Sequence, residues 1–443
     1  MSLLKIFVTC SFLATAIYFS FITKFIQIRK FKLSLRLVAS NFRKRTKLKL
    51  MKEKGDISPF SALMINLGIT GGMGNFAGVA TALAVGGPGA IFWMWLVGFL
   101  GMPITYAEGF LGVKYRRTAE NHTMSGGPMY YLRESLKNKY ISRPLAITFA
   151  VCGLALTLFL LGNVLQSNSM ALANSTQFNI PRYITALLLA VSVGIVIIGG
   201  VKRIGFFAER LVPILILLSI LGTLSIIAGK FTQIPAAIIL ILKAAFSTQA
   251  MSGALLGTIL LRAFGLAGSR VAGVAAVTQA AAKSPDPVYN GLIAMSGVFI
   301  ALAINTLIAL SVIMTSHLPP IPTTTVLALG NNSSFLPFGK FGIAFTTFVF
   351  GFIAIISWAY YGERCFEFIF GTKSIKFYRL FFIFLLFLGG MLKSNLIIVL
   401  WNLSELSIAA LMLANIVGLI RLAKTVASTT QNYYQTGQFE ELL

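Results

Sequence analysis

The chain has 443 residues, of which 57% are hydrophobic and 11% are charged, and its mean hydropathy is +0.84. Ordinary soluble domains are about a quarter charged, so this composition excludes a soluble protein and predicts an integral membrane protein. The apolar segments are continuous over roughly 20 residues, the length of a membrane-spanning helix, whereas the strands of a β-barrel alternate. We therefore expect an all-α membrane protein.

The net charge of +25 does not predict a nucleic-acid partner. The positive side chains lie in the loops between apolar segments, where membrane proteins carry them, and no groove of interleaved aromatic and basic residues is present. The three cysteines, Cys10, Cys152 and Cys365, have neither metal-binding nor redox spacing. We expect membrane lipid around the chain, no metal site, no prosthetic group and no catalytic constellation, and hence no enzyme.

The first apolar segment covers residues 6–25 and is followed by a strongly basic stretch from Arg29 to Lys54. No small-x-small cleavage site follows it, so a removable signal peptide is not indicated. A basic stretch resists translocation. We predict that residues 1–28 form an extra membrane helix with its N-terminus outside, and that residues 29–56 form a basic cytoplasmic linker.

Ten further apolar segments follow along the chain. They cover residues 58–85, 89–113, 144–173, 182–200, 209–229, 249–268, 286–316, 341–362, 378–392 and 396–422. Eleven spans with the N-terminus outside place the loops rich in Lys and Arg on one side, which the positive-inside rule assigns to the cytoplasm. The prediction is a multi-pass protein of a bacterial-type plasma membrane, with residues 427–443 as a cytoplasmic tail.

Glycines interrupt the segment 58–85. The candidate residues are Thr70, Gly71, Gly72, Gly74 and Asn75. In lipid, a broken helix is tolerated only where its backbone is buried in protein or lines a cavity, and many secondary transporters build their sites at such breaks. The free amides and carbonyls could bind a solute, so the break predicts a membrane transporter with its site here. The alternatives are close helix packing by the glycines and a helix–helix hydrogen bond from Asn75.

The ten later spans divide into two sets of five, residues 57–229 and 230–426. The second set also begins with a glycine-rich span, from Gly253 to Gly273. Five spans per half give the halves opposite orientations, and paired interrupted spans indicate an inverted-repeat transporter. The alternative for the second set is simple packing, because Gly253 and Gly257 also form a small-xxx-small pair.

Several motifs resemble one family in order along the chain. They include Gly74-Asn75-Phe76-Ala77-Gly78, Gly86-Gly87-Pro88-Gly89, Gly126-Gly127-Pro128-Met129, Gly162-Asn163-Val164-Leu165-Gln166 and Trp358-Ala359-Tyr360-Tyr361-Gly362. Over residues 57–430 the chain resembles the alanine or glycine:cation symporter family. The resemblance implies the leucine-transporter fold, a 5+5 inverted repeat plus one helix, and symport of a small amino acid with sodium or protons.

The resemblance also implies roles for single residues. Gln166 would face the substrate, with helix bridging as the alternative, and Trp358 would wall a pocket sized for alanine or glycine, with an interfacial position as the alternative. A cation site would include Gly68, Asn75 and Ser357. For Glu108 and Glu363, near cytoplasmic span ends, we expect structural ion pairs rather than a proton relay.

The chain departs from the family's pattern at positions that bear on the coupling ion. Met73 replaces a threonine at the break, Arg270 an amide, Val271 a carboxylate and Ala354 a hydroxyl residue, while Ser357 replaces a glycine. Together these changes remove oxygen ligands, so we expect sodium coupling to be weakened, altered or absent. A sodium-independent or facilitated carrier, or a non-transporting binding or sensor protein, is the alternative. The oligomeric state stays open.

Overall fold

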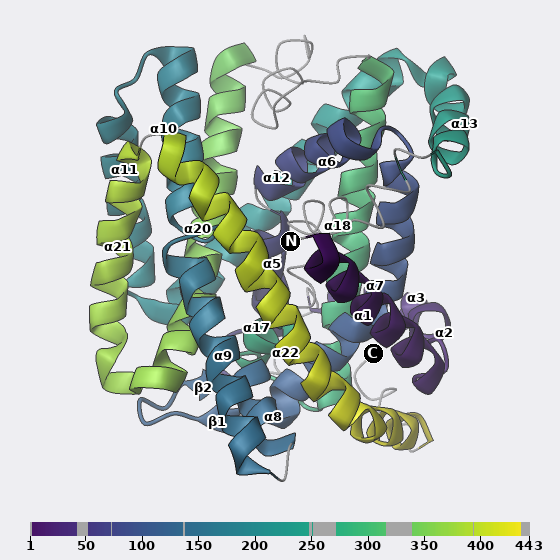
Figure 1. The fold of residues 1–443 in the computed structure, drawn as a ribbon, viewed down its shortest axis with the longest axis vertical. Coiled ribbons are helices and arrows are strands. Elements are labelled where there is room, and N and C mark those ends of the chain that lie inside the picture. The colour runs from purple at the N-terminus through teal and green to yellow at the C-terminus, as the bar shows by residue number, and fades with distance from the viewer. Residues whose placement is uncertain are drawn as a thin grey trace.

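The computed structural model describes residues 2–41, 52–71, 73–135, 138–247, 250, 272–315, 339–392 and 394–435. The described residues form α-helices, short 3₁₀ turns and one two-stranded sheet, in which β1 (Arg117–Thr118) pairs antiparallel with β2 (Met124–Ser125). Figure 1 shows most helices running between two ends of the molecule. This agrees with the predicted all-α membrane protein.

The helices of the first half are α1 (Ser2–Ile22), α2 (Ile26–Arg29), α3 (Phe31–Ser40), α5 (Pro59–Gly71), α6 (Met73–Gly86), α7 (Ala90–Lys114), α8 (Pro128–Ser135), α9 (Lys139–Leu158), α10 (Val164–Phe178), α11 (Arg182–Ile197) and α12 (Gly200–Gly229). Those of the second half are η1 (Phe231–Gln233), α13 (Ile234–Ala244), α17 (Val274–Ala280), α18 (Pro287–Thr315), α20 (Gly339–Phe370), η3 (Thr372–Ser374), α21 (Ile375–Met391) and α22 (Ser394–Gln435).

Seven helices in the described part of the chain are long and apolar enough to cross a membrane. Shorter apolar helices include Pro59–Thr70, Arg182–Ile197 and Phe231–Ala244. The predicted span 249–268 and the second glycine-rich break lie outside the described residues. The count of eleven spans and the 5+5 repeat therefore stay predictions.

The predicted span 144–173 is not one continuous helix, because α9 ends at Leu158 and α10 begins at Val164. Gly162 lies in the turn between them, and its N–H donates to the carbonyl of Leu156 at 3.1 Å, six residues back. A Cβ on Gly162 would lie 2.8 Å from the Cα of Thr157 and 3.0 Å from the Cβ of Trp358. Hydropathy gives no sign of this turn, since it is as apolar as a helix.

The segment predicted as a basic linker, residues 29–56, includes helical structure. It contains α3, which buries Ser34, Leu37 and Ser40 and packs against α18. The side-chain amide of Asn41 donates to the hydroxyl of Tyr289 at 3.3 Å. Residues 42–51 lie outside the described part. At the other terminus, α22 continues to Gln435, into the segment predicted as a tail.

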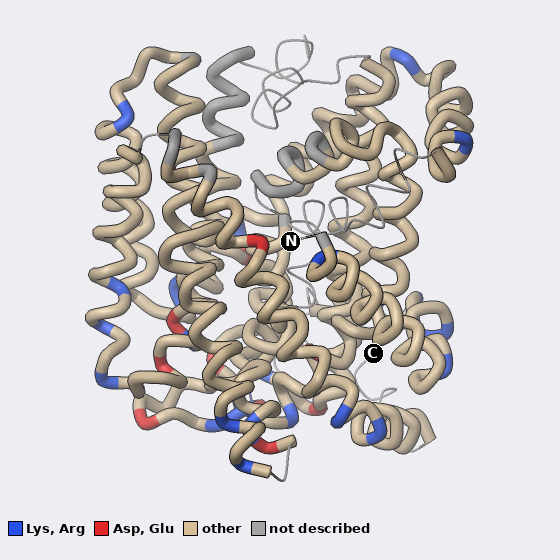
Figure 2. Tube along the Cα trace, viewed as in Figure 1, with Lys and Arg blue, Asp and Glu red and all other residues tan. Residues whose placement is uncertain are grey.

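Charged residues gather at one end of the molecule, around α8, β1 and β2, while the opposite end carries few (Figure 2). A buried ion cluster fastens elements at this end. Arg364 pairs with Glu363 at 2.6 Å and with Glu367 at 2.7 Å, and Glu363 also pairs with Arg379 of α21 at 2.7 Å. The expected ion pair of Glu363 is confirmed. The assignment of this end to the cytoplasm stays a prediction.

Candidate functional site

The predicted helix break separates α5 from α6. α5 ends at Gly71 and α6 begins at Met73, so only Gly72, which lies outside the described residues, stands between them. A helix leaves its last four carbonyls and its first four N–H groups without partners inside the helix. An interruption at Gly72, as predicted from the sequence, would bring the carbonyls at the end of α5 and the amides at the start of α6 together. Nothing is described of the side chains of residues 71–77, so the side-chain role of Asn75 is untested.

Thr70 is the last predicted site residue whose side chain is described before the break. It is buried, and its hydroxyl donates to the carbonyl of Asn66 at 3.0 Å, one turn back along α5. The proton of Thr70 is thus used within its own helix, while the hydroxyl oxygen keeps lone pairs with which to accept a hydrogen bond.

Gly68 and Ser357, both predicted for a cation site, lie in contact. A Cβ placed on Gly68 would lie 2.4 Å from the Oγ of Ser357 and 2.9 Å from Ile353. Ser357 is fully buried, and its hydroxyl has no hydrogen-bond partner among the described residues. Gly68 also carries one of the last four carbonyls of α5. This contact therefore brings an unpaired hydroxyl next to the open end of a helix.

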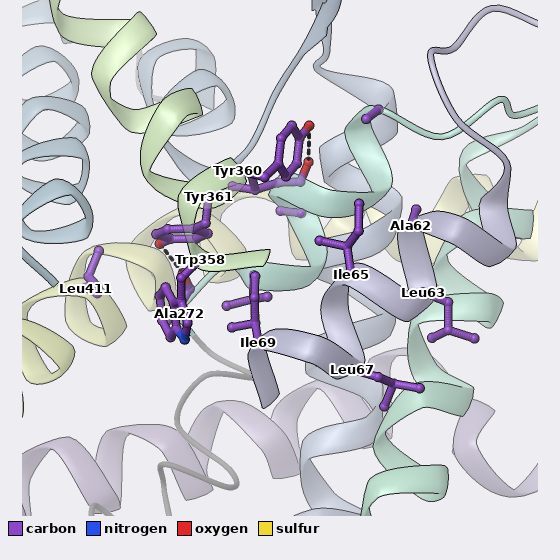
Figure 3. Close-up of a cluster of buried hydrophobic side chains, with 14 of the residues drawn as sticks. Ala62, Leu63, Ile65, Leu67, Ile69, Ala272, Trp358, Tyr360, Tyr361 and Leu411 are labelled. Carbon is purple, nitrogen blue, oxygen red and sulfur yellow. Dashed lines mark hydrogen bonds between the residues drawn. The ribbon is translucent and has the colours of Figure 1, made fainter. Parts of the chain in front are cut away.

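Trp358 lies in the packed interior and not at a membrane interface. Its side chain is 4% exposed, and its ring meets Tyr361 edge-on with 5.4 Å between centroids. Figure 3 shows Trp358, Tyr360 and Tyr361 of α20 grouped with Ile65 and Ile69 of α5. The aromatic residues of α20 thus form part of the wall that supports α5 below the break.

Gln166 lies in the first turn of α10 and is partly buried. Its amide makes no hydrogen bond with any described residue, whereas its polar neighbours are all used for packing. Asn163 donates to the carbonyl of Phe382 at 2.9 Å, Ser167 to that of Leu386 at 2.6 Å, and Asn168 to that of Gly389 at 3.1 Å. These bonds dock α10 on α21, and at 100° per residue Gln166 falls on a different face of α10.

The expected ion pair of Glu108 is wrong for the described part of the chain. Glu108 is fully buried on α7, and its Oε1 accepts from the backbone N–H of Gly273 at 3.1 Å and from the amide of Asn415 at 2.6 Å. Asn415 in turn accepts from the hydroxyl of Tyr131. A buried carboxyl group is costly unless it is hydrogen-bonded or paired with a charge. Here hydrogen bonds of the carboxyl group connect α7 to the residue before α17 and to α22.

One polar residue near the break was not predicted. Asn305 of α18 is 1% exposed, and neither its Oδ1 nor its Nδ2 has a hydrogen-bond partner among the described residues. Its only sequence signal is an amide inside the long apolar segment 286–316, which is a weak signal because such an amide often bridges helices.

The chain matches the model of the sodium:alanine symporter family over residues 1–441. The chain belongs to the sodium:alanine symporter family. Sodium/alanine symporter AgcS of Methanococcus maripaludis is 35% identical over 429 residues, which cover 95% of this chain and 92% of that protein. The probable sodium/glutamine symporter GlnT of Bacillus subtilis is 31% identical over 95% of this chain and 86% of its own length.

Membership of the sodium:alanine symporter family confirms the predicted resemblance. It makes the chain a multi-pass membrane transporter and not an enzyme. Among solved structures, the manganese transporter of Eremococcus coleocola, as its H236A mutant, aligns with a TM-score of 0.49 and 12% identity, over 85% of this chain and 77% of that one. This likeness is too weak to bear on the fold.

Proposed function

We propose that this protein imports alanine, glycine or a similarly small amino acid together with a cation, by alternating access across the plasma membrane. The observation that carries the proposal is membership of this family, and the predicted interruption at Gly72, between the end of α5 and the start of α6, supports it. Free amides at the start of α6 suit a carboxylate, and free carbonyls at the end of α5 suit an ammonium group. Relatives named as sodium/alanine and sodium/glutamine symporters support an amino acid as the substrate.

The small size of the substrate rests on the packing beside the break. Trp358 is buried there, and Gly162 approaches its Cβ so closely that no side chain fits at position 162. Gln166, with an amide that no described residue binds, is the proposed polar contact from α10. The name of GlnT shows that a larger amino acid is the alternative within the family.

The cation proposal rests on Gly68 and Ser357. Their contact supplies a helix-end carbonyl and an unpaired hydroxyl, two of the five or six oxygens that sodium prefers. Ala354, one turn before Ser357 on α20, offers no side-chain oxygen although it is 1% exposed. Met73 offers none at the break, and Arg270 and Val271 lie outside the described residues. These losses favour sodium coupling that is weaker than in the relatives, with protons as the alternative coupling ion.

The experiment that tests the proposal is uptake of labelled alanine and glycine into proteoliposomes, with and without an inward sodium gradient and with an inward proton gradient. Accumulation driven by either gradient supports symport and identifies the ion. Uptake that equilibrates without accumulation under both gradients identifies a facilitated carrier. Binding of alanine without flux would contradict transport and leave a sensor protein.

A further inference from the structure

Asn305 is a buried polar residue whose side-chain amide has no hydrogen-bond partner among the described residues. Its side chain is 1% exposed, and both its donor and its acceptor atoms lack partners among the described residues. Nearby polar residues of α18 differ in this respect. The hydroxyl of Ser296 donates to the carbonyl of Ile293, and that of Ser311 donates to the carbonyl of Ile308, both at 2.7 Å.

Residues nearer the start of α18 contact α5, and these contacts give the position of Asn305 relative to the end of α5. α5 and α18 pack against each other, and Ile57, just before α5, bridges to Ala282, in the segment that joins α17 to α18. Further along, a Cβ on Gly297 would lie 2.8 Å from Leu63. Asn305 is eight residues beyond Gly297, roughly 12 Å along the helix axis. Eight residues beyond Leu63 the chain reaches Gly71, where α5 ends.

α18 contributes side chains to two hydrophobic clusters. The larger cluster contains Leu63 and Leu67 of α5 together with Ala301 of α18. A second cluster contains Val79 of α6 together with Ile304 of α18. Ala301 thus belongs to the cluster that contains residues of α5, Ile304 belongs to the cluster that contains residues of α6, and Asn305 follows Ile304 directly in the chain. α6 and α18 pack against each other.

We propose that the amide of Asn305 binds the transported amino acid at the break between α5 and α6. The Nδ2 group donates to the substrate carboxylate, and Oδ1 accepts from the substrate ammonium group. A bare cation would use Oδ1 alone and leave Nδ2 buried without a partner, whereas a zwitterion offers both an acceptor and a donor. This inference rests on the proposed function, because it assigns a further residue to the same site.

The test is alanine binding to the purified protein, by calorimetry, for wild type, Asn305→Leu and Asn305→Asp, each at several sodium concentrations. Leucine keeps the size of the side chain but removes both polar atoms. We expect alanine affinity to fall at least tenfold in Asn305→Leu with the sodium dependence unchanged. Asn305→Asp should also bind alanine weakly, since a carboxylate cannot donate to the substrate carboxylate. It keeps the inference testable if the leucine variant does not fold.

Ser311→Ala is the matched control. It changes a buried polar residue on the same helix whose hydroxyl is already bonded within that helix, so alanine binding should equal that of wild type. Wild-type alanine affinity in Asn305→Leu would overturn the inference. So would a loss of sodium affinity in Asn305→Leu that Asn305→Asp restores, because Asn305 would then be a cation ligand. Failure of the wild type itself to bind any small amino acid would overturn the proposed function as well.

Discussion

The contact between Gly68 and Ser357 is the most specific feature at the scale of single residues. Gly68→Ala places a methyl group 2.4 Å from the Oγ of Ser357 and 2.9 Å from Ile353, both buried. Overpacking of this kind destabilises by about 1–3 kcal/mol. We expect a lower melting temperature of the purified protein and reduced uptake.

Gly229→Ala serves as the control for Gly68→Ala, because a Cβ on Gly229 meets nothing within 4 Å. Its melting temperature should differ little from that of wild type. The double variant Gly68→Ala with Ser357→Gly should recover stability, since the second change removes the hydroxyl that the methyl group meets. Equal melting temperatures for Gly68→Ala and Gly229→Ala would contradict the contact.

The Ser357→Ala variant tests whether Ser357 binds the coupling cation or only packs between helices. A buried hydroxyl without a partner costs about 1–3 kcal/mol, so a Ser357 with no ligand is a destabilising residue that alanine would improve. If Ser357 binds the coupling cation, the sodium concentration for half-maximal uptake rises, by about tenfold for the loss of about 1.4 kcal/mol. We expect this rise in the sodium concentration for half-maximal uptake in Ser357→Ala. A more stable variant with unchanged sodium dependence would remove Ser357 from the cation site.

At the scale of elements, the buried ion cluster fastens the end of α20 to its neighbours. Arg364 pairs with Glu363 and Glu367 and also donates to the hydroxyl of Ser125 in β2 at 2.8 Å. Arg364→Met would leave two buried carboxylates with less countercharge, and breaking a buried pair in this way costs about 3–5 kcal/mol. We expect a large fall in the thermal stability of the purified protein.

Arg117→Met is the matched control at this end of the molecule. Arg117 pairs with Glu134, but its side chain is 56% exposed, and exposed pairs contribute about 0–1 kcal/mol. Its melting temperature should stay near that of wild type. A fall in Arg117→Met as large as that in Arg364→Met would show that general charge, and not the buried cluster, stabilises this end.

The elements also show where prediction from sequence works and where it stops. The segments 89–113 and 286–316 correspond closely to α7 and α18, because long apolar runs mark their own limits. The predicted break falls at Gly72, outside the described residues, between the last residue of α5 and the first of α6. The turn at Gly162 was missed, since its cause is contact with Thr157 and Trp358. The partner of Glu108 was missed because Asn415 lies far along the chain and an amide carries no charge pattern.

The residue roles depended more on resemblance than on the local sequence. Nothing in the composition around Gly68 or Ser357 indicates that they touch, and the resemblance placed them in one site. Asn305 was absent from the predicted site because its isolation only becomes visible once every neighbouring donor and acceptor has been assigned a partner. A lone amide in an apolar segment predicts neither a bridge nor a binding residue.

At the scale of the whole molecule, the uneven charge distribution predicts the orientation in the membrane. The end that carries α8, β1 and β2 is expected in the cytoplasm. A single cysteine at Asn121, an exposed residue between β1 and β2, should react with a membrane-impermeant maleimide in inverted vesicles but not in intact cells. A cysteine at Thr232, in the exposed turn η1, should show the reverse pattern.

The labelling needs a background in which Cys10 and Cys152 are replaced, because neither is fully buried, whereas Cys365 is buried. Labelling of both engineered cysteines from the same side would contradict the two-ended arrangement. Reversed labelling of the two would leave the arrangement intact but invert the predicted orientation.

The two halves of the broken span are embedded in different hydrophobic clusters, α5 in the larger one and α6 in the second. Each of the two helices thus packs within its own cluster of hydrophobic side chains. A tilt of α6 against α5 at their glycine-rich junction would leave both clusters packed. Such a tilt would expose little apolar surface to water. Under the proposed alternating access, the free-energy barrier between the inward-open and outward-open states is therefore expected to depend on the substrate bound at this junction.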